Sequence, residues 1–442
     1  MGSRPLAGKT VIVAGAGLAG LSAARDLEHD GAAVLVVEAR DRVGGRVHTI
    51  RDGFAHGHHA DAGADLIESD QDHVRALARS LRLDTVRILR NGWGFYGPGP
   101  RGQRRIVSEP RTFWLAAKRL GPYVRDFKLA DERWDSAVAA AIGRQSVAQW
   151  LASGPRDQAL AAGLRGLRGF YLADPEELSL LVLVEQFASG DTPGEGEMFR
   201  LRGGNDRLAT GIADALRGPI LLNAIVRRVA QDDSLVRVTV AERGGVHELT
   251  ADACVITLPA STLRDVEFTP RLPEDQHHAI ATLPYGKATR LMLQFDRRFW
   301  KHGRRATAFG TDLPIGAVWD GNEQQRGPAG ILSLLAGGRA STELQSILAN
   351  DGEAGAIAQL AWLGPPGSLL ASRTIVWEDD PWSGGGYAYF DAAFDTRLRA
   401  WLARPAGRVM FAGEHTSLRW QGYMNGAIES GKRAAAEVRA TL

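Results

Sequence analysis

Hydrophobic positions near the start of the chain follow two patterns in turn. A short β-branched run at Thr10–Ala14 is closed by glycines, residues Leu18–His29 repeat apolar positions at helical spacing, and Ala33–Glu38 is a second apolar run. Short apolar runs predict strands, and a period of about 3.6 residues predicts a helix. The opening of the chain therefore predicts a strand–helix–strand unit.

Later parts of the chain predict a helical middle and several further strands. Residues 111–190 show long helical patterns, clearest at Phe113–Arg119 and Leu178–Phe187. Strand patterns follow at Leu221–Val240, Ala253–Leu258 and 285–295, and a strand at Val409–Ala412 precedes a helix from about Tyr423. Clusters rich in glycine, proline, asparagine and aspartate predict loops at 92–102, 191–196, 322–330 and 364–367.

A glycine-rich turn joins the first predicted strand to the first predicted helix. Gly15, Gly17 and Gly20 form the pattern G-x-G-x-x-G, with Leu18 and Ala19 between them. In a dinucleotide site the first glycine allows the tight turn, the second lets the backbone approach the pyrophosphate, and the third allows close helix–strand packing. The helix N-terminus offers N–H groups and partial positive charge to phosphates, so the turn predicts a dinucleotide site.

A second glycine loop follows the acidic residue that ends the second strand. Glu38 lies at the right distance from the first turn to accept hydrogen bonds from ribose hydroxyls. The two adjacent glycines that follow can approach the pyrophosphate closely, and a flanking arginine can neutralise phosphate or face the edge of a flavin. An NAD-binding unit does not need this extension, which favours FAD. The loop residues expected at the cofactor are Ala39, Arg40, Gly44, Gly45 and Arg46.

The end of the chain carries a third segment of this kind. A strand runs into the acidic turn Gly413–Glu414, and Gly422, Tyr423 and Met424 lead into a helix rich in small residues. Small residues let a helix lie close to a flat ligand, and its N-terminus can stabilise negative charge on a reduced ring. Because such motifs lie at the start, middle and end of the chain, cofactor and substrate domains are expected to be interleaved.

Together these blocks resemble the flavin-containing amine oxidase family, which includes monoamine, polyamine and L-amino-acid oxidases. The resemblance is strong in about 1–80, 197–300 and 377–435 and weak in 85–190. It implies an α/β fold with a Rossmann-type FAD-binding domain of glutathione-reductase type, formed by residues 1–80, 197–270 and 405–442. An α+β substrate domain, residues 81–196 and 271–404, is expected to combine a mixed sheet with helices at about 111–190.

The resemblance also places further residues at the cofactor. The segment that begins at Asp61 resembles one that passes beside the isoalloxazine ring, which adds Gly63, Ala64, Asp65 and Leu66. Val226 falls where the family contacts the adenine side through its backbone, and Leu201–Leu208 and Thr257–Pro259 resemble two other segments near the cofactor. Glu414 is then expected near the ribityl chain or the pyrophosphate, and the backbone N–H of Met424 is expected to face the flavin pyrimidine.

Two tyrosines match the aromatic pair that flanks the route to flavin N5 in this family, Tyr387 and Tyr423. Their electron-rich faces suit an amine and can orient its C–H toward N5. Ordinary packing aromatics are the alternative. Mitochondrial monoamine oxidases carry a flavin-linked cysteine just before the first tyrosine, where this chain has Gly386. The resemblance therefore implies that FAD is bound noncovalently.

One basic position departs from the family pattern. The family has a lysine that holds a water at flavin N5, nine residues before a Phe-Trp pair, and counting back from Phe299 reaches Arg290. Lys287 is expected on the opposite strand face, because side chains alternate. Arg290 can hold a water or bind a substrate anion, but it is a poor proton acceptor. A structural salt bridge is the alternative. Glu68 is a candidate base or cation anchor, with an exposed carboxylate at a helix start as its alternative.

Other side chains with chemical potential are expected to be structural. Arg165, Arg168 and Tyr171 lie in the predicted helical region, where a charged face is usually solvated. The pair His58–His59 favours a surface turn, because no further ligands occur at metal spacing, and we expect no metal.

Composition narrows the function classes. The 53 basic and 51 acidic residues leave a formal charge of +2, and no basic run suggests a nucleic-acid or membrane-surface partner. Cys254 is the one cysteine, so no internal disulfide is expected. No apolar run approaches the roughly 18 residues of a membrane span, and the first strand begins too early for a signal peptide. These features predict a cytoplasmic protein, and the preference for arginine over lysine favours a bacterial source.

The resemblance implies oxidation of a C–N bond. Hydride passes from the substrate Cα–H to flavin N5, an amine becomes an imine, and O2 reoxidises the flavin and yields H2O2. The alternatives are an L-amino-acid oxidase, in which Arg290 binds the carboxylate, and a tailoring oxidase of secondary metabolism that acts on a complex amine or amide, similar to lankacidin cyclase. A desaturase or protoporphyrinogen-oxidase-like enzyme and a noncatalytic flavin-binding protein also stay open, as does a homodimeric assembly.

Overall fold

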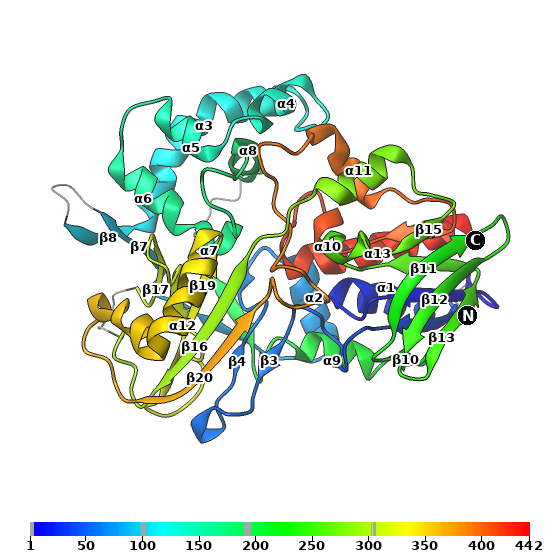
Figure 1. Ribbon diagram of the computed structural model, residues 1–442, viewed down its shortest axis with the longest axis horizontal. Helices are drawn as coiled ribbons and strands as arrows, with labels where there is room; N and C mark the ends of the chain where they lie inside the picture. Colours follow the sequence, from blue (N-terminus) through cyan, green and yellow to red (C-terminus); the bar gives the residue numbers. More distant parts are fainter. Residues whose placement is uncertain (1–3, 99–102, 190–195, 302, 304–305) are drawn as a thin grey trace.

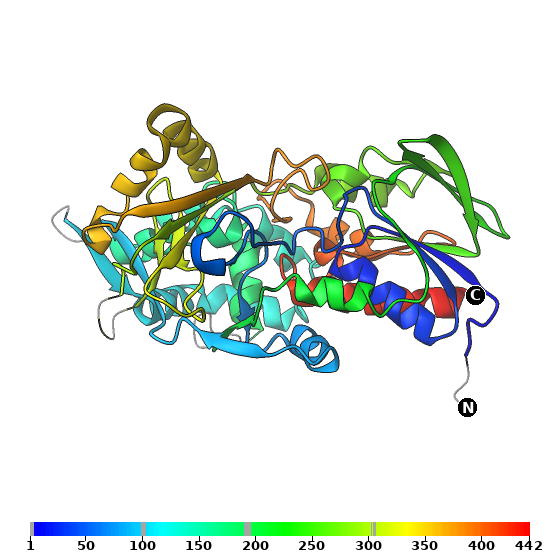
Figure 2. The ribbon, with the colours of Figure 1, turned by 90° about the horizontal axis from the view of Figure 1, so that it is seen from below.

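The computed structural model describes residues 4–98, 103–189, 196–301, 303 and 306–442. Figure 1 shows two lobes, one of which carries both chain termini. Figure 2, seen from below, shows helices α1 (Leu18–His29) and α13 (Met424–Thr441) side by side in this lobe. Segments from the start and the end of the chain therefore meet there.

The lobe of the termini is built around a parallel sheet. Within the described residues its strands follow the order β10-β2-β1-β14-β21, and every pairing is parallel. The strands are β1 (Thr10–Ala14), β2 (Ala33–Val37), β10 (Ile220–Leu221), β14 (Ala253–Ile256) and β21 (Val409–Phe411). Parallel strands end at the same edge of a sheet, so the glycine turn after β1 and the acidic turn after β21 lie close together.

Smaller elements lie in this lobe and between the two lobes, where β4 and the end of β6 pack against the sheet of the second lobe. A second sheet has the order β13-β12-β11-β15, and two short sheets pair β3 with β4 and place β9 between β5 and β6. The strands are β3 (Thr49–Ile50), β4 (Ala60–Asp61), β5 (Ile67–Glu68), β6 (Thr85–Ile88), β9 (Met198–Leu201), β11 (Ile225–Gln231), β12 (Val236–Glu242), β13 (Gly245–Ala251) and β15 (Glu267–Thr269). The helices here are α2 (Asp72–Ser80), α9 (Arg207–Ala213), α10 (Ala260–Leu263) and α11 (Glu274–Thr282).

The second lobe contains a mixed sheet with the order β20-β16-β19-β18-β17-β7-β8. Its strands are β7 (Trp93–Pro98), β8 (Arg104–Ser108), β16 (Ala288–Phe295), β17 (Ala308–Thr311), β18 (Ala317–Asp320), β19 (Gly330–Gly337) and β20 (Leu369–Val376). Pairing is antiparallel except between β7 and β17. Every residue of β16 is buried, and helix α12 (Arg339–Ala358) follows β19.

The predicted helical region forms the remaining part of this lobe. Its helices are α3 (Glu109–Leu129), α4 (Ala137–Gly143), α5 (Val147–Ala152), α6 (Gln158–Gly166), α7 (Arg168–Tyr171) and α8 (Leu180–Ala188). The side chains of Ser136, Ser146, Asp157 and Ser179 each accept a hydrogen bond from the first helical turn that follows. These caps fix where α4, α5, α6 and α8 begin.

One prediction of local structure is wrong. Glycines at 92–102 predicted a loop, but β7 occupies Trp93–Pro98 and pairs with both β8 and β17, while residues 99–102 lie outside the described residues. A Cβ at Gly94 would lie 3.0 Å from Ile106, and one at Gly97 would lie 3.1 Å from Ala162. These two glycines therefore allow close packing in a strand rather than a turn. The loop predicted at 191–196 lies outside the described residues except for Gly196.

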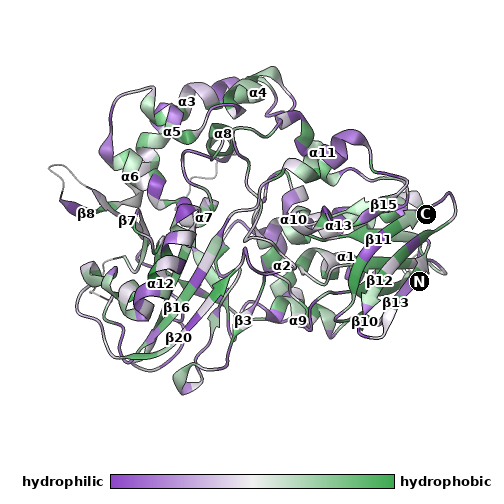
Figure 3. Cartoon of the chain, viewed as in Figure 1, coloured by the Kyte–Doolittle hydropathy of each residue, from purple (hydrophilic) through white to green (hydrophobic). Residues whose placement is uncertain are grey.

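Hydropathy follows the layers of the fold. Figure 3 shows hydrophilic and hydrophobic residues mixed along the outer helices α3, α11 and α12, as expected for helices with one face on the core. In the part of the chain that the structure describes, no helix combines the length and the apolar character that a membrane crossing requires.

Candidate functional site

A cavity with an empty volume of about 1530 Å³, part of it open to solvent, is lined by residues from both lobes. It brings together the two glycine loops, the strip between β4 and β5, and the turns around β21 and the start of α13. The predicted site residues that line it are Gly15, Gly17, Leu18, Ala19, Glu38, Ala39, Arg40, Gly44, Gly45, Arg46, Gly63, Ala64, Val226, Tyr387, Gly413, Glu414, Gly422, Tyr423 and Met424.

Other predicted site residues do not line the cavity. Gly20 lies below the glycine turn, where a Cβ would be 1.9 Å from the Gly15 carbonyl oxygen. Asp65 and Leu66 follow the lining strip and lie behind it, and Arg290 and Glu68 are also absent from the lining. The motifs therefore mark both the surface of the cavity and the residues that support it.

Several lining residues had no motif to indicate them. Leu172, Ala288 and Trp377 form a small apolar cluster that Leu335 and Tyr387 contact, and all five line one end of the cavity. They come from separate elements and are ordinary apolar residues, so no local pattern marks them. Ala288 is the exception, because strand alternation places it on the same face as Arg290, two residues away.

The geometry of the glycine turn suits a phosphate group. Gly15 has a φ of +104°, which a residue with a side chain rarely adopts. A Cβ at Gly17 would meet no atom within 4 Å, so the backbone there faces open space. No side chain caps α1, and its first turn contains no acidic residue, so its N–H groups stay available to an anion.

Glu38 and the loop after it are held by the first turn. The Glu38 carboxylate accepts hydrogen bonds from the Ala16 N–H at 2.8 Å and from the Arg40 N–H at 2.9 Å. The Arg40 guanidinium binds Asp380 at 2.6 Å. Glu38 is 5% exposed, so a buried carboxylate already oriented by backbone N–H groups lies at the cavity wall.

A partly buried ion pair joins segments from the two ends of the chain. Arg46 Nη1 lies 2.9 Å from Glu414 Oε1 and donates to the Gly386 carbonyl at 2.8 Å. The other Glu414 oxygen accepts from the Gly422 N–H at 2.9 Å. Burial opposes the charge of Arg46, but Glu414 outweighs it and raises the pKa of the guanidinium. Arg46 therefore presents a permanent positive charge at the cavity.

The two tyrosines lie on neighbouring segments at the cavity. A Cβ at Gly422 would lie 3.1 Å from the Tyr387 ring, so this glycine lets the Tyr423 segment approach it. The Tyr387 hydroxyl donates to the Phe170 carbonyl, and the Tyr423 ring meets the edge of Trp420 at 5.7 Å between centroids. Burial raises the pKa of Tyr387, and the charge of Glu68 followed by burial raises that of Tyr423. Both phenols are neutral at ordinary pH.

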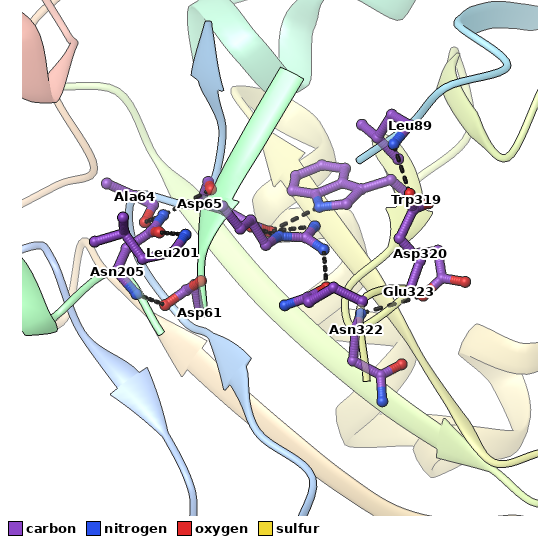
Figure 4. Close-up of polar contacts among 12 residues, drawn as sticks. Asp61, Ala64, Asp65, Leu89, Leu201, Asn205, Trp319, Asp320, Asn322 and Glu323 are labelled. Atoms are coloured by element: carbon purple, nitrogen blue, oxygen red, sulfur yellow. Dashed lines mark hydrogen bonds and ion pairs between the residues drawn. The ribbon is translucent and has the colours of Figure 1, made fainter. Parts of the chain in front are cut away.

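Arg290 lies in a buried cluster next to the lining strip. It is 1% exposed and donates from Nη2 to Asp65 Oδ2 at 2.6 Å and to the Asp61 carbonyl at 3.0 Å. Figure 4 shows Asp61 and Asn205 on one side of Asp65 and Trp319 on the other. The structure thus places Arg290 in an ion pair, and its role toward a substrate stays a prediction.

Glu68 is half-buried in β5, four residues after the end of the strip that lines the cavity. Its charge is the largest influence on the pKa of Tyr423 and also raises the pKa of Tyr171 after burial. The Tyr171 hydroxyl donates to Gln186 in α8. Glu68, Tyr171 and Tyr423 are therefore electrostatic neighbours, although the sequence separates them by more than 100 residues in each case.

Two expectations about surface residues are wrong. Arg168 is 5% exposed and donates to the carbonyls of Asp312 and Leu313, because α7 packs against the mixed sheet rather than against solvent. His58 is 5% exposed and hydrogen bonds to Gln294 and Asn322. His58 can be buried because the side-chain amides of Gln294 and Asn322 form hydrogen bonds with its imidazole.

Comparison with known proteins places the chain in a family. The family described as flavin containing amine oxidoreductase matches residues 18–439. A Mycobacterium tuberculosis protein named as the flavin-containing monoamine oxidase AofH is 29% identical, over 98% of this chain and 97% of that protein. Flavin-containing amine oxidase A of Sus scrofa is 27% identical, over 97% of this chain and 84% of its own length.

Solved structures agree with this assignment. Cyclohexylamine oxidase from Brevibacterium oxydans has a TM-score of 0.84 with 26% identity and covers 98% of this chain and 99% of its own. A putrescine oxidase bound to putrescine has the same TM-score at 24% identity, over 98% of this chain and 99% of that one, and it shows likeness of fold. The predicted family and the mixed α/β fold are confirmed. The chain belongs to the flavin-containing amine oxidoreductase family and is an oxidoreductase that acts on amines.

Proposed function

We propose that the protein binds FAD noncovalently and oxidises an amine to an imine, with O2 as the final electron acceptor and H2O2 as its product. The main support for this proposal is that the two glycine loops and a pair of tyrosines line the same cavity. Bound FAD supplies a ring that accepts the substrate hydride and passes the electrons to O2. The residues of the chain bind, orient and enclose the reacting groups.

The fit to a two-part nucleotide rests on the cavity wall. Glycines and the uncapped start of α1 suit phosphates at one part of the cavity, where Glu38 is available to ribose hydroxyls. Val226 lines the same region, as proposed for the adenine side. At the other end the strip of Gly63 and Ala64 and the apolar cluster with Trp377 suit a flat ring.

Noncovalent binding is supported by the position of the one cysteine. Cys254 lies in β14, is fully buried, and does not line the cavity. Burial raises the pKa of its thiol to about 12, so a thiolate is disfavoured at ordinary pH. Gly386 occupies the position before Tyr387 and offers no side chain for a covalent link.

We assign Tyr387 and Tyr423 to substrate positioning. Neutral phenols are poor proton acceptors, so their contribution is aromatic contact with the substrate amine and alignment of its C–H with the ring. Glu68 is proposed as a cation anchor or base beside Tyr423. Lining groups that are mostly apolar exclude water from this end of the cavity.

Among the alternatives, amine oxidation is favoured over amino-acid oxidation by one contact. An L-amino-acid oxidase would need a free arginine for the substrate carboxylate, whereas the Arg290 guanidinium is already bound to Asp65 at 2.6 Å. We also propose a cytoplasmic, bacterial enzyme with the domain boundaries given above, which rests on composition and on the order of the motifs. A role in secondary metabolism and a homodimer stay proposals of the same kind.

Anaerobic reduction of the purified protein tests this function. Cyclohexylamine, putrescine and benzylamine should bleach the flavin absorbance, and admission of air should restore it with formation of peroxide. Denaturation should release all yellow colour into solution as FAD. A protein that takes up no flavin, or whose bound flavin no amine reduces, would contradict the proposal.

A matched tyrosine pair tests the aromatic site. Tyr387→Leu should lower the rate constant of flavin reduction at least about tenfold, because the ring that positions the amine is removed. Tyr389→Leu is the control, since Tyr389 is two residues away and does not line the cavity. Equal effects of the two substitutions would refute the role of Tyr387.

A further inference from the structure

One carboxylate behind the cavity wall binds two arginines at once. Asp65 Oδ2 accepts from Arg290 Nη2 at 2.6 Å and from Arg200 Nη2 at 3.3 Å, and Arg200 Nε also lies against Asp65 Oδ1. Asp65 is 5% exposed, Arg290 is 1% exposed, and Arg200 has no exposed surface. All three charges therefore interact without screening by bulk water.

A tryptophan completes this cluster. The Trp319 indole N–H donates to Asp65 Oδ2 at 2.7 Å, and the Arg290 guanidinium lies 4.3 Å from the centre of the Trp319 ring. Figure 4 shows the indole pointing toward Asp65 from its own strand. Arg290 is thus held by a carboxylate, a ring face and a carbonyl, which leaves its guanidinium little freedom to turn.

The cluster is attached directly to the wall of the cavity. Arg290 binds the carbonyl of Asp61 and the side chain of Asp65, the residues on either side of the lining strip Ala62–Ala64. Asn205 holds the same strip from the other side, donating from Nδ2 to the Asp65 carbonyl at 2.7 Å. Leu335, which pairs with Arg290 across β16 and β19, also lines the cavity.

The charges in this cluster do not cancel. Burial opposes ionisation of Asp65, but Arg200 and Arg290 outweigh it and hold the pKa of Asp65 below its usual range. Burial, followed by the negative charge of Asp65, raises the pKa of Asp61 to about 7, so Asp61 is only partly ionised near neutral pH. Two guanidinium groups therefore face one full and one partial carboxylate charge. Asp320, the next buried acid, has Arg298 at 3.5 Å and Lys301 at 3.3 Å as its own partners.

We propose, as an extension of the proposed function, that Arg290 is a positioning residue: with Asp65 and Arg200 it fixes the strip Ala62–Ala64 against the ring end of the cavity and maintains net positive charge behind that wall. Fixed positive charge favours the electron-rich state of a bound ring, which accepts negative charge when it is reduced. Arg290 then acts through Asp65 and through its field rather than by proton transfer or by direct contact with a substrate carboxylate.

The sign of the shift in reduction potential tests this inference. Arg290→Gln removes one positive charge and should lower the ratio of reduced to oxidised flavin at a given potential about tenfold, equivalent to about 30 mV for a two-electron couple. Asp65→Asn removes the negative charge and should shift the ratio in the opposite direction. Arg290→Lys retains the charge and should leave the ratio within about threefold, while the loss of the two-point contact lowers kcat more than it changes KM.

Arg399→Gln is the matched control for loss of a buried arginine. Arg399 is 3% exposed, pairs with Glu185 at 3.1 Å and stacks 3.8 Å above the Trp134 ring. Unlike Arg290, it bonds to Glu185 and to the Leu418 carbonyl, which do not line the cavity or flank the strip Ala62–Ala64. Its substitution should lower stability as Arg290→Gln does, without moving the flavin potential. If Asp65→Asn does not fold, the flavin potentials of Arg290→Gln and Arg399→Gln are sufficient to test the inference.

The potentials are measured on FAD-loaded protein by reductive titration against a reference dye, which requires no amine. Equal potentials in wild type and Arg290→Gln, equal shifts in Arg290→Gln and Arg399→Gln, or shifts of the same sign in Arg290→Gln and Asp65→Asn would each overturn the inference. If no amine reduces the FAD bound to the wild-type protein, the proposed function is wrong, whatever the reduction potentials are.

Discussion

At the scale of single residues, two glycines of the same motif have different physical tasks. A Cβ at Gly17 would meet open space in the cavity, whereas a Cβ at Gly20 would lie 1.9 Å from the Gly15 carbonyl oxygen and 2.9 Å from Thr257 Oγ1. Gly17 therefore leaves room for a ligand, whereas Gly20 allows α1 to pack closely on the turn after β1. Both appear as the same letter in the motif.

Gly17→Ala and Gly20→Ala should separate these tasks. Gly17→Ala should keep the unfolding free energy of the apoprotein within about 0.5 kcal/mol but weaken FAD binding at least about tenfold, because its methyl group enters the cavity. Gly20→Ala should cost about 1–3 kcal/mol through a steric clash. Denaturant unfolding and fluorescence titration with FAD measure the two effects. Unaltered FAD affinity in Gly17→Ala would exclude contact between the turn and the cofactor.

At the scale of elements, close contact between α1 and α13 places the cavity at the start of a helix. A Cβ at Gly431 would lie 2.2 Å from the Ala19 carbonyl oxygen, so the two helices touch backbone to backbone. Met424, the first residue of α13, lines the cavity. Contact in the middle of the helix therefore sets the position of its N-terminus at the site.

Gly431→Ala should push the two helices apart. We expect a loss of about 1–3 kcal/mol in unfolding free energy and weaker FAD binding, since Met424 moves with the helix. Gly211→Ala in α9 is the control: the nearest atom to its Cβ is the end of the flexible Leu81 side chain at 3.2 Å, so alanine in this helix interior should add up to about 1 kcal/mol. Opposite signs in thermal or denaturant unfolding are the expected result. A stabilising effect of both substitutions would show that the helix contact yields easily.

At the scale of the whole molecule, buried imidazole groups couple stability to pH. Burial lowers the pKa of His415, which is 4% exposed, from 6.5 to about 4. The unfolded chain thus takes up a proton at a pH where the folded protein does not. Stability from this group is complete above about pH 6.5 and decreases as the pH falls toward 4, by up to about 3 kcal/mol.

His415→Asn should reduce the acid dependence of stability. The decline in unfolding free energy between pH 6.5 and 4 should be smaller than in wild type, by up to about 3 kcal/mol over the interval. Urea unfolding at several pH values measures this difference. His29→Asn is the control, because the His29 side chain is 90% exposed and its replacement removes a histidine without a change in the core. An identical pH slope in wild type and His415→Asn would contradict the assignment.

Agreement between sequence and structure depends on how local each signal is. The helix Leu18–His29 and the strand Thr10–Ala14 have the predicted bounds, because hydrophobic period and glycine punctuation act within a few residues. The glycines of β7 predicted a loop, because close approach of Ile106 and Ala162 cannot be read from the segment itself. The burial of Arg168 and His58 was missed for the same reason: their partners come from distant segments.

The amino-acid sequence alone was enough to predict the family, the mixed α/β fold and those lining residues that belong to glycine-rich motifs, because such motifs depend on short-range backbone geometry. Only the tertiary structure showed which residues from distant segments lie together, because strand pairing and register determine those contacts. It joined Leu172, Ala288, Leu335 and Trp377 into one end of the cavity, and it bound Arg290 and Arg200 to the same carboxylate, Asp65. Contacts between segments that lie far apart in the sequence arise from sheet order and packing, which no local pattern encodes.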